Sequence, residues 1–459
     1  MKPSLLRLKL HPAQIIVFGF FILILLGAVL LSLPISTQPG HKVSLLGAFF
    51  TSTSAVCVTG LVVADTGTTY TLFGQIVILL LIQAGGLGVM TVTTMVFLLI
   101  GKRITLSERM ILRESLNEFD LSGLVKMIVK VLKITLITEL GGAVLLAIRF
   151  VPMFGVKGIY YSVFHAVSAF CNAGFDLMGH EYGPFSSFVP FASDPLVVLT
   201  LAALILMGGF GFLVVTDIFS ISRIRERKRL ARYTKLVLAI NAALIGIGLI
   251  AFFSAELGNG KTLGGLDTGG KILGGIFQAI TPRTAGFNTI DQSALLPVSK
   301  LITITLMFIG ASPAGTGGGI KTTTAAIAAL FALYGIMGRK DITLRERRIS
   351  PGTIQRATII MITSFVFVLA ACFALVSIEG HRGGMFSFEN LIYEVVSGFG
   401  TVGLTTGITP QLSAASHIVL IITMFVGRVG LTSLVISLAS RAGQNNTFIR
   451  YPEERIMVG

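Results

Sequence analysis

The chain has 459 residues, of which 53% are hydrophobic and only 12% are charged, and its mean hydropathy is +0.86. Soluble domains carry about 25% charged residues, so this composition excludes a soluble globular protein. The net charge of +15 does not indicate nucleic-acid binding, because the basic residues lie in short clusters between apolar stretches, as the positive-inside rule expects of membrane proteins.

Apolar stretches near the roughly 20 residues that a helix needs to span a bilayer occur along the whole chain. The first runs from Ile15 to Leu33, and because no small-residue cleavage site follows it, we predict a retained span and not a signal peptide. The others lie around 75–100, 196–221, 236–253, 357–378 and 417–439. The predicted class is a polytopic, all-α membrane protein.

Four short segments align without gaps, and each contains a glycine at the same place. They are Cys57-Val58-Thr59-Gly60-Leu61, Cys171-Asn172-Ala173-Gly174-Phe175, Arg283-Thr284-Ala285-Gly286-Phe287 and Gly400-Thr401-Val402-Gly403-Leu404. Six positions before the glycine stand Ser54, Ser168 and Ser397, with Ile280 in the remaining copy. Each segment follows an apolar stretch too short to span a bilayer, at roughly 44–57, 158–171, 270–282 and 386–397. Four copies of one structural unit are therefore predicted.

The repeated unit is a span, a short helix, a glycine loop and a second span. Four units predict eight transmembrane helices and four re-entrant pore hairpins in a pseudo-fourfold arrangement, with repeats at 1–101, 102–222, 223–338 and 339–459. The second spans carry glycines as well: Gly85-Gly86-Leu87-Gly88, Gly208-Gly209-Phe210-Gly211, Gly427-Arg428-Val429-Gly430 and the longer Gly310–Gly319. We expect the paired glycines to serve close helix packing. In the third unit, five glycines and Pro313 should break the helix.

The basic clusters predict the orientation of the chain. They join successive units at Lys102–Arg113, Arg223–Arg232 and Arg339–Arg348, and further basic residues lie near both ends. The segments that hold the glycine loops are poorer in lysine and arginine. Both termini should therefore be cytoplasmic, with the glycine loops entering from outside.

Non-helical backbone at membrane depth is tolerated only where it is buried in protein or lines a water-filled path. Four glycine loops, one from each quarter of the ring, would converge on a central axis, where their carbonyl oxygens could replace the hydration shell of a cation. Glycine permits the positive φ that turns successive carbonyls inward, and the short helices would direct their partially negative C-termini at the ion. The sequence therefore predicts a cation filter.

With these motifs the chain resembles, over nearly its whole length, the membrane subunit of the Ktr/Trk/HKT superfamily of K⁺ transporters. Its first span begins at about residue 13, without the two extra N-terminal spans of Trk-type subunits, so it is most similar to the Ktr type. The resemblance implies K⁺ uptake across the plasma membrane through a selectivity filter, gated by an intramembrane loop and a pore arginine. The filter residues that it assigns are Thr59, Gly60, Ala173, Gly174, Ala285, Gly286, Val402 and Gly403. The gate residues are Gly310, Ser312, Pro313, Gly315, Thr316, Gly317, Gly318, Gly319 and Arg428.

The resemblance also implies the ions and partners. Glycine in all four filter positions favours K⁺ over the Na⁺ permeation associated with a serine in the first loop of some plant relatives. No cofactor is expected in this chain; K⁺ is the transported ion and the only metal, bound at the filter, and Na⁺ is a candidate activator. The implied partners are a second copy in a homodimer, the lipid bilayer and a cytosolic ring of subunits that bind ATP, ADP or NAD. The basic loops at 102–113, 223–235 and 339–356 could contact that ring or serve only as topology and lipid signals.

Several alternatives remain at this stage. Arg428, an intramembrane charge, could pair with Glu139 instead of facing the pore, and Asp176 could be a solvated loop carboxylate instead of a group that concentrates cations at the outer mouth. A secondary solute transporter also has broken helices, but its repeats are inverted, whereas these four share one sense. An enzyme would need clustered His, Asp or Glu, and the six histidines form no such cluster.

Overall fold

The computed structural model describes residues 12–88, 124–220, 229–339, 341–344, 347–382, 386–431 and 434. Within these ranges the chain is helical apart from loops and one two-stranded hairpin, β1 (Thr343–Leu344) and β2 (Arg347–Arg348), which is a small departure from the all-α expectation. The basic loop at 102–113 and parts of the loops at 223–235 and 339–356 lie outside the described residues.

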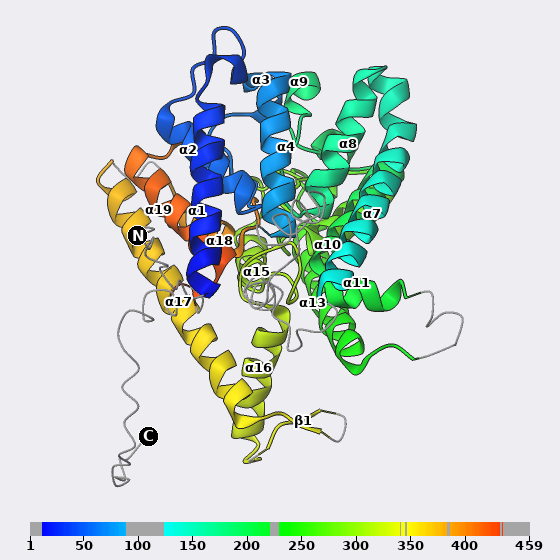
Figure 1. Cartoon of the computed structure of the whole chain (residues 1–459), viewed down its shortest axis with the longest axis vertical. Helices are drawn as coiled ribbons and strands as arrows, with labels where there is room; N and C mark the ends of the chain where they lie inside the picture. The colour runs from blue at the N-terminus through cyan, green and yellow to red at the C-terminus, as the bar shows by residue number, and fades with distance from the viewer. Residues whose placement is uncertain are drawn as a thin grey trace, which may run out of the picture.

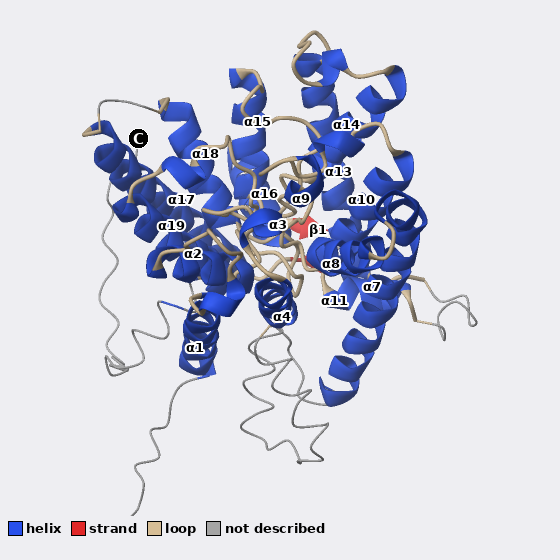
Figure 2. Ribbon diagram, turned by 90° about the horizontal axis from the view of Figure 1, so that it is seen from above, coloured by secondary structure: helices blue, strands red, loops and turns tan. Residues whose placement is uncertain are grey.

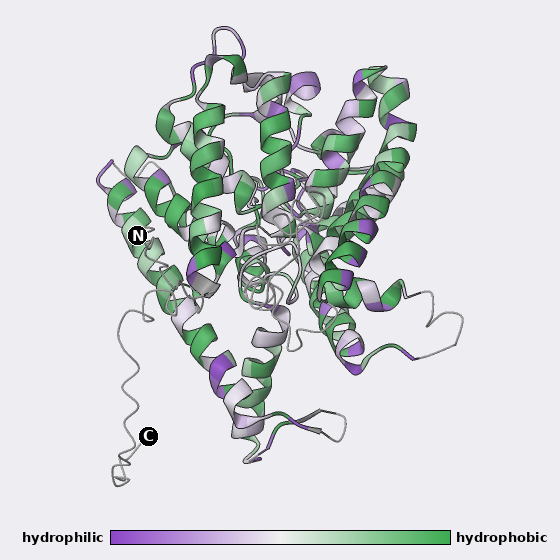
Figure 3. Ribbon diagram, viewed as in Figure 1, coloured by the Kyte–Doolittle hydropathy of each residue, from purple (hydrophilic) through white to green (hydrophobic). Residues whose placement is uncertain are grey.

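Four described helices are each long and apolar enough to cross a membrane. They are α1 (Pro12–Leu31), α7 (Leu124–Phe154), α13 (Arg232–Glu256) and α17 (Pro351–Gly380), and each opens one repeat (Figure 1). Helix α7 was not among the apolar stretches read from the sequence, because Lys126, Lys130 and Glu139 interrupt its hydrophobic residues. These helices expose large apolar side chains such as Ile22, Ile137 and Phe373, as contact with lipid requires. Figure 3 shows that hydrophobic residues predominate along them.

Each long helix is followed by a short one, which we call a pore helix. The pore helices are α2 (Leu45–Val56), α8 (Lys157–Phe170), α14 (Thr268–Ile280) and α18 (Phe388–Gly400), and they coincide with the four short stretches predicted from the sequence. Two begin at a side-chain cap: Ser44 accepts from the amide of Gly47, and Asp267 accepts from that of Gly270. The starting points of these two helices are therefore encoded locally.

Of the helices that follow the glycine loops, two are interrupted within the described residues, and two end at a glycine. They are α4 (Leu72–Leu87), α10 (Pro195–Gly209) with α11 (Phe212–Ile218), α15 (Pro297–Phe308) with α16 (Thr322–Ile336), and α19 (Ala414–Val429). Helices α10 and α11 are bent by 110° at their junction. The remaining short helices are α3 (Thr66–Thr69), α9 (Gly179–Tyr182), η1 (Pro34–Ser36), η2 (Val189–Phe191), η3 (Leu263–Gly265) and η4 (Thr409–Gln411).

The helices pack in a closed cycle. Each long helix packs on the pore helix of its own repeat: α1 on α2, α7 on α8, α13 on α14 and α17 on α18. Each later helix packs on the pore helix of the next repeat: α4 on α8, α10 on α14, α15 on α18, and α19 back on α2. Figure 2 shows the result from above, with loops gathered in the middle of the molecule and helices around them.

Candidate functional site

The four glycine loops share one backbone pattern. In each loop the residue two positions before the glycine has a positive φ: Val58 (51°), Asn172 (57°), Thr284 (69°) and Thr401 (50°). The glycines do so as well: Gly60 (92°), Gly174 (68°), Gly286 (80°) and Gly403 (89°). A positive φ is uncommon outside glycine and a genuine outlier for a β-branched residue. Because the residue between the two has a negative φ, the carbonyls of successive residues can turn to the same side, as the sequence argument expects.

In the first and fourth loops a serine fastens the glycine to the pore helix. The amide of Gly60 donates to Ser54 Oγ (3.0 Å), and the amide of Gly403 donates to Ser397 Oγ (3.1 Å). All four residues are buried. A buried amide needs a partner, and the hydroxyl at the sixth position before the glycine supplies it.

The second and third loops are fastened by a different bond. Ser168 Oγ donates to the carbonyl of Phe175, one residue beyond the loop glycine (2.7 Å). Ile280 has no hydroxyl, and the next residue takes over that function, because Thr281 Oγ1 donates to the carbonyl of Phe287 (2.7 Å). The exception in the serine pattern therefore has a structural substitute one position along the chain.

The four glycines lie in one closed ring. A Cβ placed on any of them would come within 2.9 Å of a carbonyl oxygen in the next loop. These contacts run from Gly60 to Ala173, from Gly174 to Ala285, from Gly286 to Val402 and from Gly403 to Thr59. All eight residues predicted for the filter are thus brought together, and the ring has no room for a side chain at the glycines.

The ten residues from Gly310 to Gly319, which we call the gate loop, separate α15 from α16. One side of the loop bonds to the end of α10: the amide of Ser312 donates to the carbonyl of Gly209 (3.0 Å), and the amide of Thr316 to that of Gly208 (3.2 Å). The predicted helix break is therefore present, and two of the amides that it frees are satisfied by the second repeat.

The other side of the gate loop contacts the fourth repeat. The amide of Gly318 donates to Thr401 Oγ1 (2.8 Å), and the amide of Gly319 donates to the carbonyl of Gly427 (3.1 Å). Thr401 is the residue of positive φ in the fourth glycine loop. The bond from Gly318 to Thr401 therefore joins the gate loop directly to the fourth glycine loop.

Arg428 lies against the gate loop. Its guanidinium donates to the carbonyl of Thr316 in the loop and to the carbonyls of Gly85 and Gly86 at the end of α4. The alternative in which Arg428 pairs with Glu139 is wrong, because the Glu139 carboxylate accepts from Gln83 Nε2 (3.3 Å) instead. Arg428 thus links the fourth repeat to the third and the first.

The glycine motifs of the second spans have two structural functions. Their first glycines, Gly85, Gly208 and Gly427, each face the carbonyl at the end of a pore helix so closely that a Cβ would overlap it. Their last glycines, Gly88, Gly211 and Gly430, have φ values of 84°, 90° and 85° and stand where the helix ends or bends. The packing interpretation is correct for the first glycine and incomplete for the last, which breaks the helix.

A buried positive charge lies behind the third glycine loop. Arg283 is only 5% exposed and donates to Asn241 Oδ1 (2.5 Å) and to the carbonyl of Gly310 (3.5 Å). Asn241 Nδ2 donates in turn to Ser312 Oγ (3.1 Å), which also accepts from Thr322 Oγ1 (3.1 Å). This chain of bonds ties the third glycine loop to both ends of the gate loop.

Asp176 lies two residues beyond Gly174, in the loop outside the helices. Its half-buried carboxylate accepts from the amide of Met178 (3.0 Å). Burial and the nearby carboxylate of Asp65 raise the pKa of Asp176 to about 7, against the opposing effect of the Met178 amide. Its charge therefore changes near neutral pH.

Comparison with known proteins identifies the family. The family model described as "TrkH: Cation transport protein" matches residues 11–448. The chain belongs to this family. It is 39% identical to Ktr system potassium uptake protein B of Bacillus subtilis, covering 98% of this chain and 97% of that protein. It is 38% identical to potassium/sodium uptake protein NtpJ of Enterococcus hirae, covering 99% and 98%. The crystal structure of the potassium transporter TrkH from Vibrio parahaemolyticus superposes on this chain with a TM-score of 0.67 and a sequence identity of 17%. The superposition covers 92% of this chain and 85% of that one, so the two proteins share a fold.

The resemblance to Ktr/Trk transporters is thus confirmed at the level of the family, and a cation transport protein with these apolar helices is a membrane protein. Sequence reasoning missed the functions of three residues in this site. It did not predict the contacts of Thr401 and Lys321 with the gate loop, or the burial of Arg283. The sequence did contain a clue to Thr401, because this residue stands two positions before a loop glycine. The bond of Lys321 Nζ to the carbonyl of Gly317 (2.7 Å) had no sequence signal.

Proposed function

We propose that this protein carries K⁺ into the cell through a selectivity filter formed by the ring of Thr59, Gly60, Ala173, Gly174, Ala285, Gly286, Val402 and Gly403. The observation that carries the proposal is the fourfold recurrence of one backbone conformation at the ends of four pore helices that pack in a closed cycle. Carbonyl oxygens arranged in this way replace the water around a cation, and the C-terminal ends of the pore helices add negative potential.

The choice of K⁺ rests on relatives and on the filter itself. The Bacillus subtilis relative is named for potassium uptake and the Enterococcus hirae relative for potassium and sodium uptake. The four loop glycines, Gly60, Gly174, Gly286 and Gly403, add no side chain that could compete with the carbonyls for the ion. We propose K⁺ as the preferred ion, with Na⁺ as the competitor to be tested and as a candidate activator.

The gate loop and Arg428 form the proposed gate. The loop is anchored to the ring through Thr401 and to α10 through Gly208 and Gly209, and the positive charge of Arg428 lies against it. A charge beside the ion path repels K⁺, and the hydrogen bond from Arg428 to Thr316 holds the loop in place. Shortening the gate loop should therefore raise K⁺ flux in protein that remains folded.

We propose that the chain crosses the membrane eight times, with both termini in the cytoplasm of the cell. Four crossings are the long helices, and four are formed by the helices that follow the glycine loops. Single cysteines near residues 106, 226 and 344 should react only with reagent on the cytoplasmic side, and those near 66, 180 and 292 only with reagent outside. One position labelled from the opposite side would overturn this topology.

The proposed partners are a second copy of the chain and a cytosolic ring of nucleotide-binding subunits. Support comes from the name of the Bacillus subtilis relative, which belongs to a Ktr system, and from the basic loops at the proposed cytoplasmic face. Co-purification of the protein with a candidate cytosolic nucleotide-binding subunit would test both partners, since a homodimer and its complex with a ring have distinct masses.

Reconstituted vesicles test the proposed function directly. Purified protein should mediate K⁺ flux down a K⁺ gradient, with K⁺ preferred over Na⁺. A secondary solute transporter would instead move a solute in proportion to a coupling ion. Absence of K⁺ flux in folded protein with its cytosolic partner present would overturn the proposal.

A further inference from the structure

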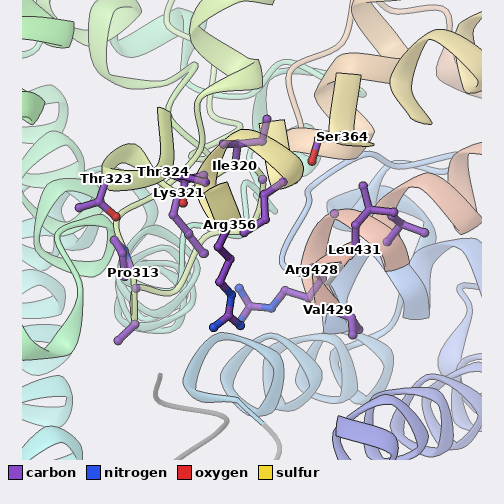
Figure 4. Close-up of a pocket in the computed structure, with 18 of the residues that line it drawn as sticks. Pro313, Ile320, Lys321, Thr323, Thr324, Arg356, Ser364, Arg428, Val429 and Leu431 are labelled. Atoms are coloured by element: carbon purple, nitrogen blue, oxygen red, sulfur yellow. The ribbon is translucent and has the colours of Figure 1, made fainter. Parts of the chain in front are cut away.

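A large cavity lies beside the gate loop on the side away from the filter. Its volume is about 660 Å³, and Pro313, Gly315 and Arg428 line it, whereas none of the four filter glycines does. The beginnings of α16 and α17 and the end of α19 complete its wall (Figure 4). We call this space the inner cavity.

The inner cavity carries three positive side chains, Lys321, Arg356 and Arg428, and among the described residues that line it none is acidic. In Figure 4, Arg356 and Arg428 extend from different helices into the same part of the cavity. Arg428 and Lys321 donate to backbone carbonyls. Arg356 is exposed and makes no hydrogen bond or ion pair with any residue that the structure describes. Within the described part of the chain, these three side chains have no acidic partner in the cavity, and their combined positive potential attracts an anion.

Two helix N-termini add to this potential. Helix α16 begins after Lys321 and helix α17 after Ser350, and neither residue caps its helix with a side chain. Thr323, Thr324 and Thr353 from the first turns of these helices line the cavity. Free amides and the helix dipole favour negative charge at an N-terminus, and threonine hydroxyls can donate to it.

We infer that the inner cavity binds a phosphate group, held between Arg356 and Arg428 with Lys321 and the first turns of α16 and α17 around it. Guanidinium groups match the several oxygens of a phosphate in geometry as well as in charge. The cavity is much larger than a single phosphate, and its lining also includes the apolar Ile16, Phe20 and Ile360, of which Phe20 lies under the Arg428 guanidinium. The phosphate could therefore belong to an anionic phospholipid or to a soluble phosphate compound.

Phosphate binding also gives the cavity a regulatory function, which rests on the proposed K⁺ transport. A phosphate bound to Arg428 competes with the carbonyl of Thr316 for the same donors, so it weakens the hold of Arg428 on the gate loop. It also neutralises positive charge next to the ion path. Occupied protein should then conduct K⁺ better than empty protein.

Binding to detergent-purified protein in its native oligomeric state tests the site without any transport. The soluble probes are inorganic phosphate and glycerol phosphate; the lipid probes are short-chain phosphatidylglycerol and, as a control without net charge, short-chain phosphatidylcholine. Isothermal titration calorimetry should show binding that R356Q weakens by about tenfold or more, because charge-assisted hydrogen bonds are lost. The matched control is R339Q, which removes one charge from Arg339, a residue that stacks on Tyr334 and does not line the cavity.

The possible outcomes distinguish a lipid from a soluble source of the phosphate, and the phosphate site from the proposed K⁺ transport. Tighter binding of phosphatidylglycerol than of glycerol phosphate assigns the site to lipid, and equal binding assigns it to a soluble phosphate. No binding of any phosphate probe, or equal weakening by R356Q and R339Q, rejects the inference. Vesicles that transport K⁺ while the protein binds no phosphate reject only the inference, whereas phosphate binding without K⁺ transport rejects the proposed function and leaves the site in place.

Discussion

Replacement of Gly60 by serine changes the ring at one carbonyl. The added Cβ would lie 2.5 Å from the oxygen of Ala173, and ordinary contact begins at 3.4 Å, so this carbonyl must move by about 0.9 Å (3.4 minus 2.5). Gly60 also has a φ of 92°, which costs a residue with a Cβ about 1–2 kcal/mol. Gly40 provides the matched control, because its φ is 88° and nothing lies within 4 Å of its Cβ position.

The size of the effect follows from the displaced oxygen. A carbonyl that leaves a dehydrated cation costs about as much as a hydrogen bond to a charged group, roughly 1.5–3 kcal/mol. Since 1.4 kcal/mol is a factor of ten in affinity, the half-saturating K⁺ concentration of G60S should rise by about tenfold or more. The preference for K⁺ over Na⁺ should fall, because a distorted ring no longer matches the larger ion. G40S carries the same backbone strain and should keep both values.

The assay is ion flux into vesicles that hold equal amounts of wild-type protein, G60S or G40S, measured over a range of K⁺ and Na⁺ concentrations. Gel filtration before reconstitution shows that each variant is folded. If folded G60S keeps the K⁺ affinity and the selectivity of G40S, Gly60 is a packing residue and the ion path lies elsewhere.

Three further predictions concern the gate, the serine anchors and the outer mouth. R428Q should raise K⁺ flux without partner by about tenfold, because a unit charge about 10 Å from the ion contributes roughly 1.7 kcal/mol at an effective dielectric constant of about 20; R348Q, which loses only a surface ion pair with Asp341, should not, and equal flux in the two variants would contradict the gate. S397A leaves the buried amide of Gly403 without its acceptor, at a cost of about 1–3 kcal/mol, so its thermal midpoint should fall while that of S254A, at an exposed position, stays near wild type. Because the pKa of Asp176 is raised to about 7, its carboxyl is neutral at pH 6 and charged at pH 8, and K⁺ flux at low K⁺ should rise across this interval in wild-type protein but not in D176N. A rise of the same size in D176N would assign the pH dependence to another group.

Features encoded by local sequence were predictable. The pore helices coincide with the short apolar stretches at 44–57, 158–171, 270–282 and 386–397, and side-chain caps at Ser44 and Asp267 fix the start of two of them. The break at the gate loop was likewise predictable from its five glycines and Pro313. Helix α7 was harder to recognise, since lysines and Glu139 dilute its apolar pattern.

The internal repeat alone determined that four equivalent glycine loops exist and which residues occupy them, because a repeat preserves position within each unit. The tertiary structure decided what those residues touch. The bond from Gly318 to Thr401, the carbonyls that Arg428 holds, and the cavity shared by Arg356 and Arg428 join segments far apart in the chain. Such contacts depend on how the four repeats close on one another, and no local spacing encodes that closure.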